Sequence, residues 1–502
     1  MNKNLRPVAT PLMLAGSLML SSCAVGPDFH APAAPEVKSL TSGTVPAQTA
    51  ATPGAEAGAA QSLQNGADIP AKWWELFQSP KLNELVQQAL AANPTMASAQ
   101  AALRNAQENL RASQSGFFPA VTANAGVTRQ SISLASYGLP GGNDIFNLFN
   151  ASVNVSYTLD LFGGTRRAVE AQAAQVDYRR FELESTYLTL SANTVTTALL
   201  AASLRTQEDA TNDIIAAQLE QLRVLHKQFE LGAVSQGDVL AVEAQVAATQ
   251  ATLPPLQKGL AQAQNQLANY VGKFPGTFTP VDLNLTDLKL PQQLPLSLPS
   301  ELVRQRPDVR AAEAQLHQTS VGGGVATANM LPQITLSGAY GAEAGTPRDL
   351  FSPGTAIWNV GAGLLQPIFN AGQLSARRRA AVAAYDQSLA DYQTVVAGAF
   401  QNVADVLAAL DADANALNAQ YGAYGAADKS LQLVQKQYQL GAVSYLGLLN
   451  AQRQYQQARI AYVQAVATRY QDTAALFQAL GGGWWNRDAG SAATTPAPAA
   501  NP

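Results

Sequence analysis

The chain has 502 residues, enough for several domains, but only 13% of them are charged, about half the share found in an ordinary soluble protein. Its formal net charge is −4 and it carries no block of basic residues, which argues against a nucleic-acid-binding protein. Cys23 is the only cysteine, so an intrachain disulfide is excluded and a thiolate zinc site or a thiol enzyme is disfavoured.

Residues 1–22 have the pattern of a lipoprotein-type signal peptide. Lys3 and Arg6 precede an apolar run from Val8 to Leu20, which is too short to span a membrane as a helix. The run ends in Leu-Ser-Ser-Cys, which resembles a bacterial lipobox and predicts a covalent lipid on Cys23. An ordinary signal peptide with an incidental cysteine is the alternative. No apolar run of 18 residues follows, so the mature chain is expected to cross a membrane only with strands.

Two segments flank the body of the chain. Residues 23–70, rich in Ala, Pro, Thr, Ser and Gly, are expected to form a lipidated N-terminus and an extended tether, and residues 486–502 a disordered tail. Between them, three features recur at a separation of 213 positions: Asn93-Pro94 with Arg306-Pro307, Leu103 with Leu316, and Pro119 with Pro332. This recurrence predicts a first structural repeat over 71–275, an inter-repeat linker over 276–297 and a second repeat over 298–485.

Each repeat is expected to open with a helix and then to contain two β-strands. The strands are expected at about 120–133 and 150–160, and at about 333–342 and 356–367, because apolar and small polar residues alternate there. Strands of about ten residues with one apolar face are typical of tilted transmembrane strands, although a soluble sandwich shows the same alternation. Four strands cannot close a barrel, so the membrane interpretation requires an oligomer, and three chains supply twelve strands.

Long helices are expected after the strands, at 165–231 in the first repeat and at 373–440 in the second. The first range holds no Gly or Pro, and at about 1.5 Å per residue it predicts a rod of roughly 100 Å. Returning helices are expected over 236–271 and 445–480. Their apolar residues are spaced three and four apart, which is typical of a coiled coil.

A repeated octapeptide joins each long helix to the helix that comes after it. Residues 228–235 read QFELGAVS and residues 437–444 read QYQLGAVS. The copies share a glycine that can end a helix and a serine that can cap the next one: Gly232 with Ser235, and Gly441 with Ser444. Asp238 completes a capping box in the first copy, where the second copy has Gly447. Capping alone explains the motif as two helical hairpin turns without a function.

Six segments carry a more specific signal: CAVGPDF from Cys23, Trp73-Trp74, YTLDLFGG (157–164), RPDVRAAEAQL (306–316), LGAVSYLGLLNAQR (440–453) and ALGGGW (479–484). In combination they resemble the lipoprotein branch of the TolC-type outer-membrane efflux channels, the OprM and NodT relatives. The resemblance implies an α+β membrane protein that forms a homotrimer. Four strands per chain would join in a twelve-stranded outer-membrane β-barrel, continued by a long periplasmic α-helical coiled-coil barrel.

The resemblance also implies a function and partners. Such channels are the passive exit ducts of tripartite efflux pumps for drugs or other small toxic compounds, in the outer membrane of a Gram-negative bacterium. Their partners are a periplasmic adaptor of the membrane fusion protein type, an inner-membrane transporter of the RND type and outer-membrane lipid. Apart from the lipid on Cys23, the resemblance implies no cofactor, and no nucleic acid is expected.

By position, the resemblance assigns adaptor docking to the hairpin tips. The docking residues are Gly232, Ala233, Val234, Ser235, Gly441, Ala442, Val443 and Ser444. It also implies a periplasmic gate, in which Leu446 matches an apolar constriction ring and Arg453 matches an arginine nearby. Tyr438 and Asp238 match a pair whose bond helps to hold TolC closed. Gly447 and Asn450 stand where TolC carries the carboxylates of its entrance ring, which predicts a gate of low charge. A trimer with Leu446 at its axis is expected to close by dewetting.

Rival functions remain. A related duct for type I protein secretion would share most of these features, and neighbouring genes would decide. A periplasmic coiled-coil lipoprotein without a pore would form no heat-sensitive trimer and would conduct no ions. An enzyme is disfavoured, because the chain has no HExxH, GxSxG or phosphate-loop motif, and its histidines (His30, His226 and His317) are scattered and are interpreted as structural.

Overall fold

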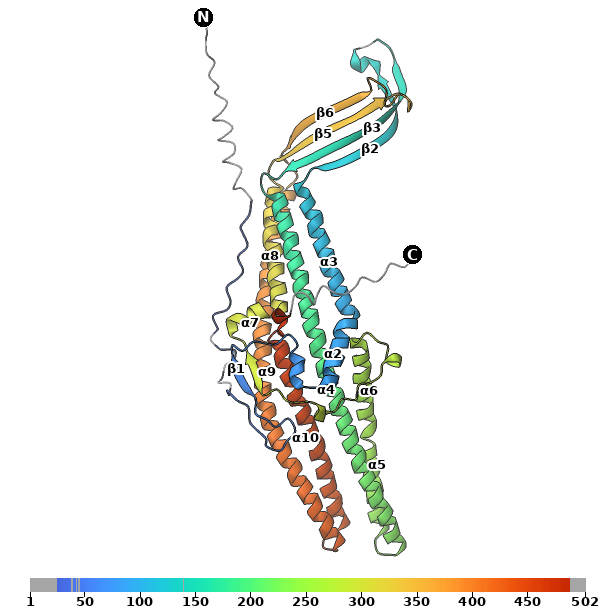
Figure 1. Cartoon of the computed structure of the whole chain (residues 1–502), viewed down its shortest axis with the longest axis vertical. Coiled ribbons are helices and arrows are strands. Elements are labelled where there is room, and N and C mark those ends of the chain that lie inside the picture. Colours follow the sequence, from blue (N-terminus) through green and yellow to red (C-terminus); the bar gives the residue numbers. More distant parts are fainter. Residues whose placement is uncertain (1–24, 38, 42, 44–45, 139, 488–502) are drawn as a thin grey trace. The chain divides into compact units, whose positions relative to one another are not determined.

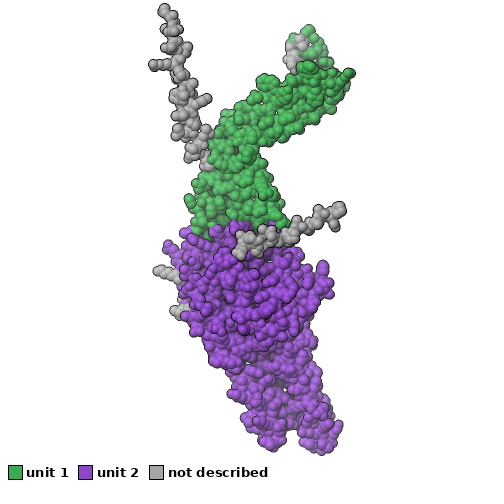
Figure 2. Space-filling view, in the orientation of Figure 1, with its two compact units in different colours: residues 1–32, 103–179, 312–392 green, residues 33–102, 180–311, 393–502 purple. Residues whose placement is uncertain are grey.

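The structure, a computed structural model, describes residues 25–37, 39–41, 43, 46–138 and 140–487. Cys23, the signal segment and nearly all of the predicted tail lie outside these residues. The chain divides into two compact units, which Figure 2 colours separately. Among the described residues, the sheet unit comprises 25–32, Leu103–Arg179 and Ala312–Tyr392. The helical unit comprises Ala33–Ala102, Arg180–Ala311 and the residues from Gln393 onward.

The sheet unit contains a four-stranded antiparallel sheet with the strand order β2-β3-β5-β6 (Figure 1). Its strands are β2 (Ala120–Ser133), β3 (Asn143–Leu159), β5 (Gln333–Ala344) and β6 (Ala356–Leu365). The two central strands come from different repeats, and they pair from Phe149 opposite Ala344 to Leu159 opposite Ile334. The sheet is therefore built jointly by the two halves of the chain.

β3 begins at Asn143, well before the expected start at about residue 150. Its early residues pair with the second half of β2, so that Asn143 lies opposite Ser133. The neighbouring apolar pairs Ile145-Phe146 and Leu148-Phe149 interrupt the alternation that marks a strand in a sequence. Backbone pairing with β2 does not depend on that alternation, and it extends the hairpin into the expected loop.

The register gives the sheet one apolar and one small polar face. One row on the apolar face crosses all four strands: Ala123, Val153, Tyr340 and Trp358. The adjacent row on the other face consists of Thr122, Asn154, Ala339 and Asn359. Tyr340 is 68% exposed and Trp358 is 74% exposed, so the apolar face is not covered by the described chain.

β2 and β6 are the edges of this sheet. Among the described residues, no further strand pairs with either of them. Every residue of β6 is exposed, and the side chain of Val360 is 81% exposed; β2 is exposed along most of its length. The two exposed edges of this sheet lack strands to pair with, and its exposed apolar face lacks an apolar layer to contact.

Two helices of 67 residues each, α4 (Gly164–Glu230) and α9 (Gln373–Gln439), pass from the sheet unit into the helical unit. The shorter helices are α2 (Pro80–Ala92), α3 (Pro94–Gln114), α5 (Gln236–Gln250), α6 (Leu253–Tyr270), α7 (Pro299–Gln305), α8 (Pro307–Ala328) and α10 (Tyr445–Ala479). α5 and α6 are separate because Pro254 lies in the first turn of α6, where the missing N–H group costs no hydrogen bond. α10, at the equivalent place in the second repeat, runs unbroken for 35 residues.

α9 is long and apolar enough to cross a membrane by length and composition alone, although the sequence shows no continuous apolar run. The apolar residues of α9 in the helical unit pack against other parts of the protein. Val403, Leu407, Leu410 and Leu417 are buried in the main hydrophobic core of the protein. One face of α9 therefore contributes to the core of the helical unit.

The main core of the helical unit is built around aromatic side chains. Trp73, in the short helix η1 (Trp73–Phe77), stacks on Phe477 of α10 with ring centroids 5.4 Å apart. Trp73, Trp74 and Phe77 are almost completely buried. After α10, Gly483 has a φ of 71°, and a Cβ atom there would lie 2.3 Å from the Ile69 carbonyl oxygen. A glycine is therefore required where the chain end passes this core.

The segment before Trp73 corrects the expectation of an extended tether over 23–70. Strand β1 (Ser62–Asn65) pairs in parallel with β4 (Gln293–Leu296), which lies in the expected linker 276–297. Arg469 of α10, fully buried, donates hydrogen bonds to the carbonyl oxygens of Ala57 and Ala59, both at 2.8 Å. The segment is therefore packed and hydrogen-bonded from about residue 47. The composition of the segment could not reveal this packing, because both of its partners, β4 and Arg469, lie more than 200 residues away in the sequence.

Candidate functional site: the two hairpin tips

The two hairpin tips, Leu231–Ser235 between α4 and α5 and Leu440–Ser444 between α9 and α10, have the same backbone turn. Gly232 and Gly441 both adopt the left-handed conformation, with φ angles of 72° and 73°. In the first tip, the Ala233 N–H donates to the Gln228 carbonyl at 2.8 Å, and in the second tip Ala442 donates to Gln437 at 2.8 Å. This pattern is a Schellman motif, which satisfies the last carbonyl groups of a helix.

The helices after the two tips start differently. Ser235 accepts a hydrogen bond from the Asp238 N–H at 3.2 Å, and the Asp238 carboxylate accepts from the Ser235 N–H at 3.1 Å and hydroxyl at 2.7 Å. This reciprocal pair is a complete capping box. Ser444 accepts from the Gly447 N–H at 3.4 Å, but glycine has no side chain to return the bond.

The outer surface of each tip carries no charge. Leu231 and Leu440 are 85% and 84% exposed, and the glycine and alanine after each leucine are exposed as well. Small, uncharged side chains leave the backbone of the turn accessible. Such a surface can contact a partner by shape and by backbone hydrogen bonds, with little electrostatic contribution.

A small hydrophobic cluster lies behind the tips and joins the two hairpins. Its buried members are Leu225, Val239, Val242, Val246, Tyr445, Leu448 and Leu449. Tyr445 also meets Tyr438 edge-on, with ring centroids 5.6 Å apart. The Tyr445 hydroxyl is buried without a hydrogen-bond partner in the described chain, and burial raises the pKa of Tyr445. The aromatic ring therefore anchors the second tip against the first hairpin.

The predicted gate residues lie close to this cluster. The side chain of Leu446 is 60% exposed in the protomer. Arg453 is exposed and donates a hydrogen bond to the Asn450 side chain, one helical turn earlier. These residues place an apolar side chain and an uncharged amide on the surface of the second hairpin.

The structure does not contain the expected hydrogen bond between Tyr438 and Asp238. Among the described contacts, the Asp238 carboxylate is bound by Ser235 of its own tip. Burial raises the pKa of Tyr438, and the Asp238 charge raises it further. A local capping bond between residues three positions apart takes precedence here over a bond between hairpins, because it requires less chain ordering.

A seam of glutamines between α4 and α10 was not identified from the sequence. The Gln452 amide donates to the Gln221 amide oxygen at 2.5 Å, and Gln464 donates to Gln207 at 3.1 Å. The buried Gln218 amide has no hydrogen-bond partner in the described chain. The spacing of these glutamines on α4 could have revealed a shared helix face. The seam is polar but uncharged, so hydrogen bonds between side-chain amides, and not ion pairs, connect the two hairpins here.

A half-buried acid was also missed. Asp413 of α9 lies beside Asp472 of α10, and burial together with the second carboxyl group raises the pKa of Asp413 to about 7. The Oδ2 atom of Asp413 is buried without a hydrogen-bond partner in the described chain. In the sequence the two acids are 59 positions apart, and neither stands in a recognisable motif.

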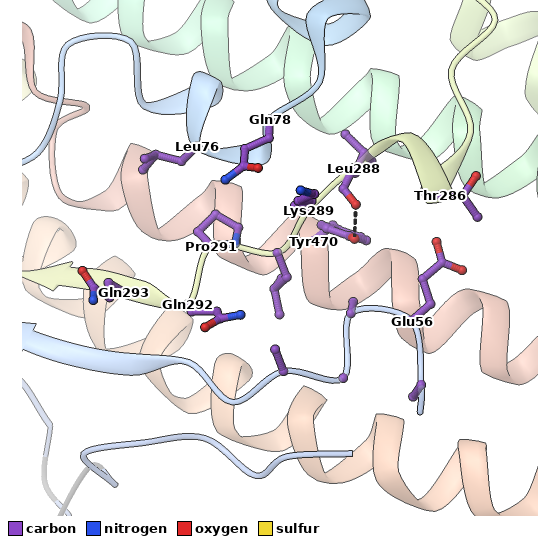
Figure 3. A pocket seen from close by; sticks show the side chains of 15 residues that line it. Glu56, Leu76, Gln78, Thr286, Leu288, Lys289, Pro291, Gln292, Gln293 and Tyr470 are labelled. Carbon is purple, nitrogen blue, oxygen red and sulfur yellow. Dashed lines mark hydrogen bonds between the residues drawn. The ribbon is translucent and has the colours of Figure 1, made fainter. Parts of the chain in front are cut away.

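A cavity of about 890 Å³ lies in the helical unit between residues 55–59 and residues 286–293 (Figure 3). Glu56 and Tyr470 line it, and the Tyr470 hydroxyl donates to the Leu288 carbonyl oxygen at 3.0 Å. Burial raises the pKa of the Glu56 carboxyl group. The described residues contain no group of three side chains that could hold a metal ion. The cavity is a polar hollow beside the ordered N-terminal segment.

An antiparallel sheet with free edges, joined to long paired helices with capped tips, defines a class of outer-membrane channel. The family model for outer membrane efflux proteins matches residues 85–273 and 298–482, and the chain belongs to this family. The family predicted from the six sequence segments is thereby confirmed. It is a family of transport ducts and not of enzymes.

Individual relatives cover nearly the whole chain. The pyoverdine export outer membrane protein OpmQ of Pseudomonas aeruginosa is 28% identical over 418 residues, 82% of this chain and 87% of that protein. The probable outer membrane lipoprotein SilC of Salmonella typhimurium is 26% identical over 480 residues, 95% of this chain and 98% of that protein. The solved structure of the outer-membrane channel OprN is 29% identical, with a TM-score of 0.81 over 92% of this chain and 100% of that chain. The predicted location, the outer membrane of a Gram-negative bacterium, is confirmed.

Proposed function

We propose that the protein is the exit duct of a tripartite efflux pump, and that it works as a homotrimer. Each chain contributes β2, β3, β5 and β6 to a twelve-stranded barrel in the outer membrane. The helices α4 and α9 continue this barrel as a helical tunnel in the periplasm, since 67 residues of helix extend roughly 100 Å. The chain supplies no energy of its own and conducts cargo passively.

The single observation that carries the proposal is the sheet with two free edges. In hydrocarbon, each unpaired backbone group of β2 and β6 would cost several kcal/mol, so an open sheet cannot remain in a bilayer. Pairing β6 of one chain with β2 of the next removes both edges. The apolar row of Val153, Tyr340 and Trp358 then faces lipid, while the row containing Asn154 and Asn359 lines an aqueous lumen.

The tips and the N-terminus define the remaining contacts. The exposed, uncharged turns at Gly232–Ser235 and Gly441–Ser444 would dock a periplasmic adaptor, which connects the duct to an inner-membrane transporter of the RND type. A lipid on Cys23 would anchor the chain in the outer membrane, and the relative SilC is named as an outer membrane lipoprotein. Relatives are named for exporting pyoverdine, antibiotics and toluene, which supports a duct whose cargo is chosen by its partners.

The trimer and the lipid face can be tested together. Purified wild-type protein should run as a trimer on unheated gels and as a monomer after heating, and native mass measurement should give three chains. Val360→Arg places a charge on the apolar face of β6, whereas Asn359→Arg, the adjacent residue of the same strand, places it on the other face. A charge facing lipid costs about 2–4 kcal/mol, so only Val360→Arg should strongly reduce the membrane-inserted trimer.

Two results would overturn the proposal. Equal damage by Val360→Arg and Asn359→Arg would show that the apolar face of the sheet does not meet lipid. A wild-type protein that stays monomeric and conducts no ions in planar bilayers would support a periplasmic lipoprotein without a pore. Co-purification from cells then separates a drug-efflux duct from a protein-secretion duct, because the former retains an RND-type transporter and its adaptor.

A further inference from the structure

Three consecutive arginines near the start of α9, Arg377, Arg378 and Arg379, have no partner among the residues that the structure describes. All three are exposed, and the first turn of α9 contains no acidic residue. Some other arginines of the sheet unit form ion pairs, as Arg111 does with Glu108 at 2.6 Å and Arg166 does with Asp160 at 3.4 Å. Arg377 is the fifth residue of α9, beyond the first turn in which the helix dipole acts, and no ion pair within the described chain accounts for the triplet.

The chain just before the triplet is apolar and exposed. β6 ends at Leu365, and Ile368 and Phe369, a few residues later, are 95% and 89% exposed. From Gln373 the helix rises about 1.5 Å per residue, which places Arg378 roughly 7 Å beyond the start of α9. Outer-membrane strands end in a girdle of aromatic residues, and the phospholipid headgroups lie in the next few ångströms. In the proposed barrel, the triplet would therefore lie at the depth of the headgroups.

Arg378 also lines a cavity of about 540 Å³ in the sheet unit. Ser320 and Thr327 of α8 line the cavity, as do Val382 and Tyr385 of α9. The cavity thus combines a guanidinium group, hydroxyl-bearing side chains and apolar walls. That mixture suits the glycerophosphate end of a phospholipid, which presents an anionic phosphate next to ester groups and methylene chains.

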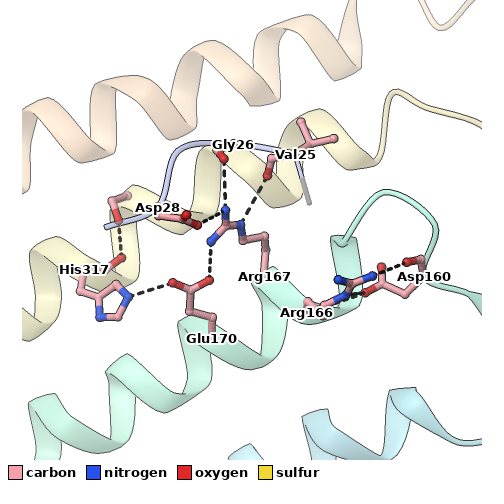
Figure 4. A network of polar contacts seen from close by, with 9 residues as sticks. Val25, Gly26, Asp28, Asp160, Arg166, Arg167, Glu170 and His317 are labelled. Carbon is pink, nitrogen blue, oxygen red and sulfur yellow. Dashed lines mark hydrogen bonds and ion pairs between the residues drawn. The ribbon is translucent and has the colours of Figure 1, made fainter. Parts of the chain in front are cut away.

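The remaining wall of the cavity is the N-terminal segment 25–30, which is fixed in place (Figure 4). Arg167, buried on α4, donates hydrogen bonds to the Gly26 carbonyl at 3.1 Å and to the Asp28 carboxylate at 2.8 Å. Phe29 stacks on His317 of α8 with ring centroids 4.4 Å apart. His317 contacts Glu170 of α4 at 3.1 Å, so its role is to hold this segment between α4 and α8.

The segment 25–30 brings the expected lipid attachment site, Cys23, close to the cavity. Cys23 is two residues before Val25, and two residues of chain reach at most about 7 Å. A lipid attached to Cys23 would thus enter the bilayer within this distance of the cavity wall. This step rests on the function proposed above, because it requires both the lipid and insertion of the sheet in the outer membrane.

We propose that Arg377, Arg378 and Arg379, together with the cavity beside the N-terminal segment, bind the phosphate headgroup of an anionic phospholipid in the inner leaflet of the outer membrane. A guanidinium group binds a phosphate through two parallel hydrogen bonds, which Arg378 can offer from the cavity wall. Consecutive helix residues point in different directions, so Arg377 and Arg379 would add positive charge on either side of this site or contact separate headgroups. Bound lipid would hold the start of α9 at a fixed depth, on the opposite side of the cavity from the covalent lipid.

The test uses the full-length wild-type protein and a triple variant, R377Q/R378Q/R379Q, both purified in a neutral detergent. The probe is short-chain phosphatidylglycerol, with short-chain phosphatidylcholine and inorganic phosphate in parallel. Phosphatidylglycerol should raise the unfolding temperature of the wild type and bind the triple variant roughly tenfold more weakly, since several charge-assisted contacts are lost. Arg111→Gln, which removes a paired exposed arginine of the same unit, is the matched control and should behave as wild type.

Single substitutions sharpen the assignment. Arg378→Gln should weaken phosphatidylglycerol binding more than Arg377→Gln, because Arg378 lines the cavity. Arg378→Lys keeps the charge but loses the bidentate geometry, so its binding should be intermediate. Equal binding of phosphatidylglycerol by all variants would overturn the proposal. An equal response to inorganic phosphate would also overturn it, because it would indicate an unspecific anion site.

The outcomes distinguish this proposal from the function on which it rests. A triple variant that still forms a trimer and conducts ions, but binds phosphatidylglycerol as well as wild type does, overturns the lipid site and leaves the duct intact. A triple variant that loses its trimer in lipid-free detergent shows that the arginines bind a neighbouring chain, which also overturns the lipid site. A wild-type protein that forms no trimer and conducts no ions would contradict the proposed function as an exit duct.

Discussion

The two hairpin tips share one turn and differ in the first turn of the next helix. In both, a left-handed glycine and a backbone bond of 2.8 Å from the next alanine close the long helix. After the turn, the first tip continues into a capping box closed by Asp238. The second tip instead buries Tyr445 and leaves Leu446 exposed. At the places equivalent to these two residues, the first tip has Gln236 and Gly237.

The comparison separates two tasks. The part that the tips have in common sets the shape of an uncharged surface, which suits docking of the same partner at two places. The part that differs gives the second hairpin alone an aromatic anchor and an outward-facing apolar side chain. Docking should therefore respond to changes in either tip, whereas closure of the channel should respond only to changes in the second.

The largest effect is expected from Leu446→Ser. In the proposed trimer, three copies of Leu446 close the pore by excluding water, and a serine hydroxyl binds water instead. The resting conductance in planar bilayers should rise severalfold. Leu231→Ser, which changes the most exposed leucine of the first tip, is the control and should leave conductance unchanged. Equal conductance of wild type and Leu446→Ser would show that Leu446 does not close the pore.

A pair of substitutions at Tyr445 tests the aromatic anchor. Tyr445→Ala removes a buried ring and should destabilise the tip locally by about 3 kcal/mol. Tyr445→Phe removes only a hydroxyl that is buried without a partner in the described chain, so it should stabilise the tip by about 1 kcal/mol. Hydrogen exchange of residues 431–450 would measure both. Faster exchange in Tyr445→Phe than in wild type would show that the hydroxyl has a partner in the trimer.

The second hairpin also carries a pH-dependent contact. The pKa of Asp413 is raised from its ordinary value of 3.8 to about 7, so the folded state binds its proton more tightly than the unfolded state does. The stability from this group is present below about pH 4 and is lost as the pH rises through 7. Asp413→Asn should therefore raise the unfolding temperature at pH 8 more than at pH 5.

A matched control for this prediction is Asp405→Asn, which removes an exposed acid from the same helix. It should leave the pH dependence of the unfolding temperature as in wild type. If Asp413→Asn kept the wild-type slope between pH 4 and pH 7, Asp413 would not be the group that titrates.

A smaller effect is expected when the capping residues of the two tips are exchanged. Asp238→Gly removes the capping box and should destabilise the start of α5 by about 1 kcal/mol. Gly447→Asp should stabilise the start of α10 by a similar amount, because a side chain there meets only Val443 at an ordinary 3.8 Å. Hydrogen exchange at the first turns of both helices should change in opposite directions. A change of the same sign in both would show that the bonds between hairpins, not the caps, set local stability.

The smallest effect is expected from multivalent cations applied to wild type from the periplasmic side. Asn450 is uncharged, and the Asp238 carboxylate is already bound by Ser235. Hexamminecobalt should therefore reduce conductance only slightly. Gly447→Asp introduces a carboxylate near the gate and should increase the block, which gives a positive control. Strong block of the wild type would place exposed carboxylates at the entrance.

Regular periodicity made much of the fold predictable from the sequence. The absence of Gly and Pro over 165–231 corresponds to α4 (Gly164–Glu230), and alternation over 120–133 corresponds to β2. The early part of β3 lacks the alternation of apolar and polar residues, and the expected start of this strand was therefore too late. The packed segment from residue 47 was missed for a related reason, since Arg469 and β4 lie far along the chain from the residues that they hold.

The candidate site was predictable in its local geometry but not in its contacts across the chain. The turn at Gly232 and the capping box at Ser235 depend on neighbouring residues and are seen as expected. The burial of Tyr445 depends on α5, which precedes it by about 200 residues, and no short motif records that contact. His317 illustrates the same limit, because its partners Phe29 and Glu170 come from two other segments.

Two uncovered strand edges also constrain how the protein is made. The helical unit has its own aromatic core, so it can fold in water soon after export. The sheet of a single chain, with β2 and β6 unpaired, would expose a template on which other chains could aggregate. In the proposed trimer, barrel closure would therefore be expected to accompany membrane insertion of the three chains.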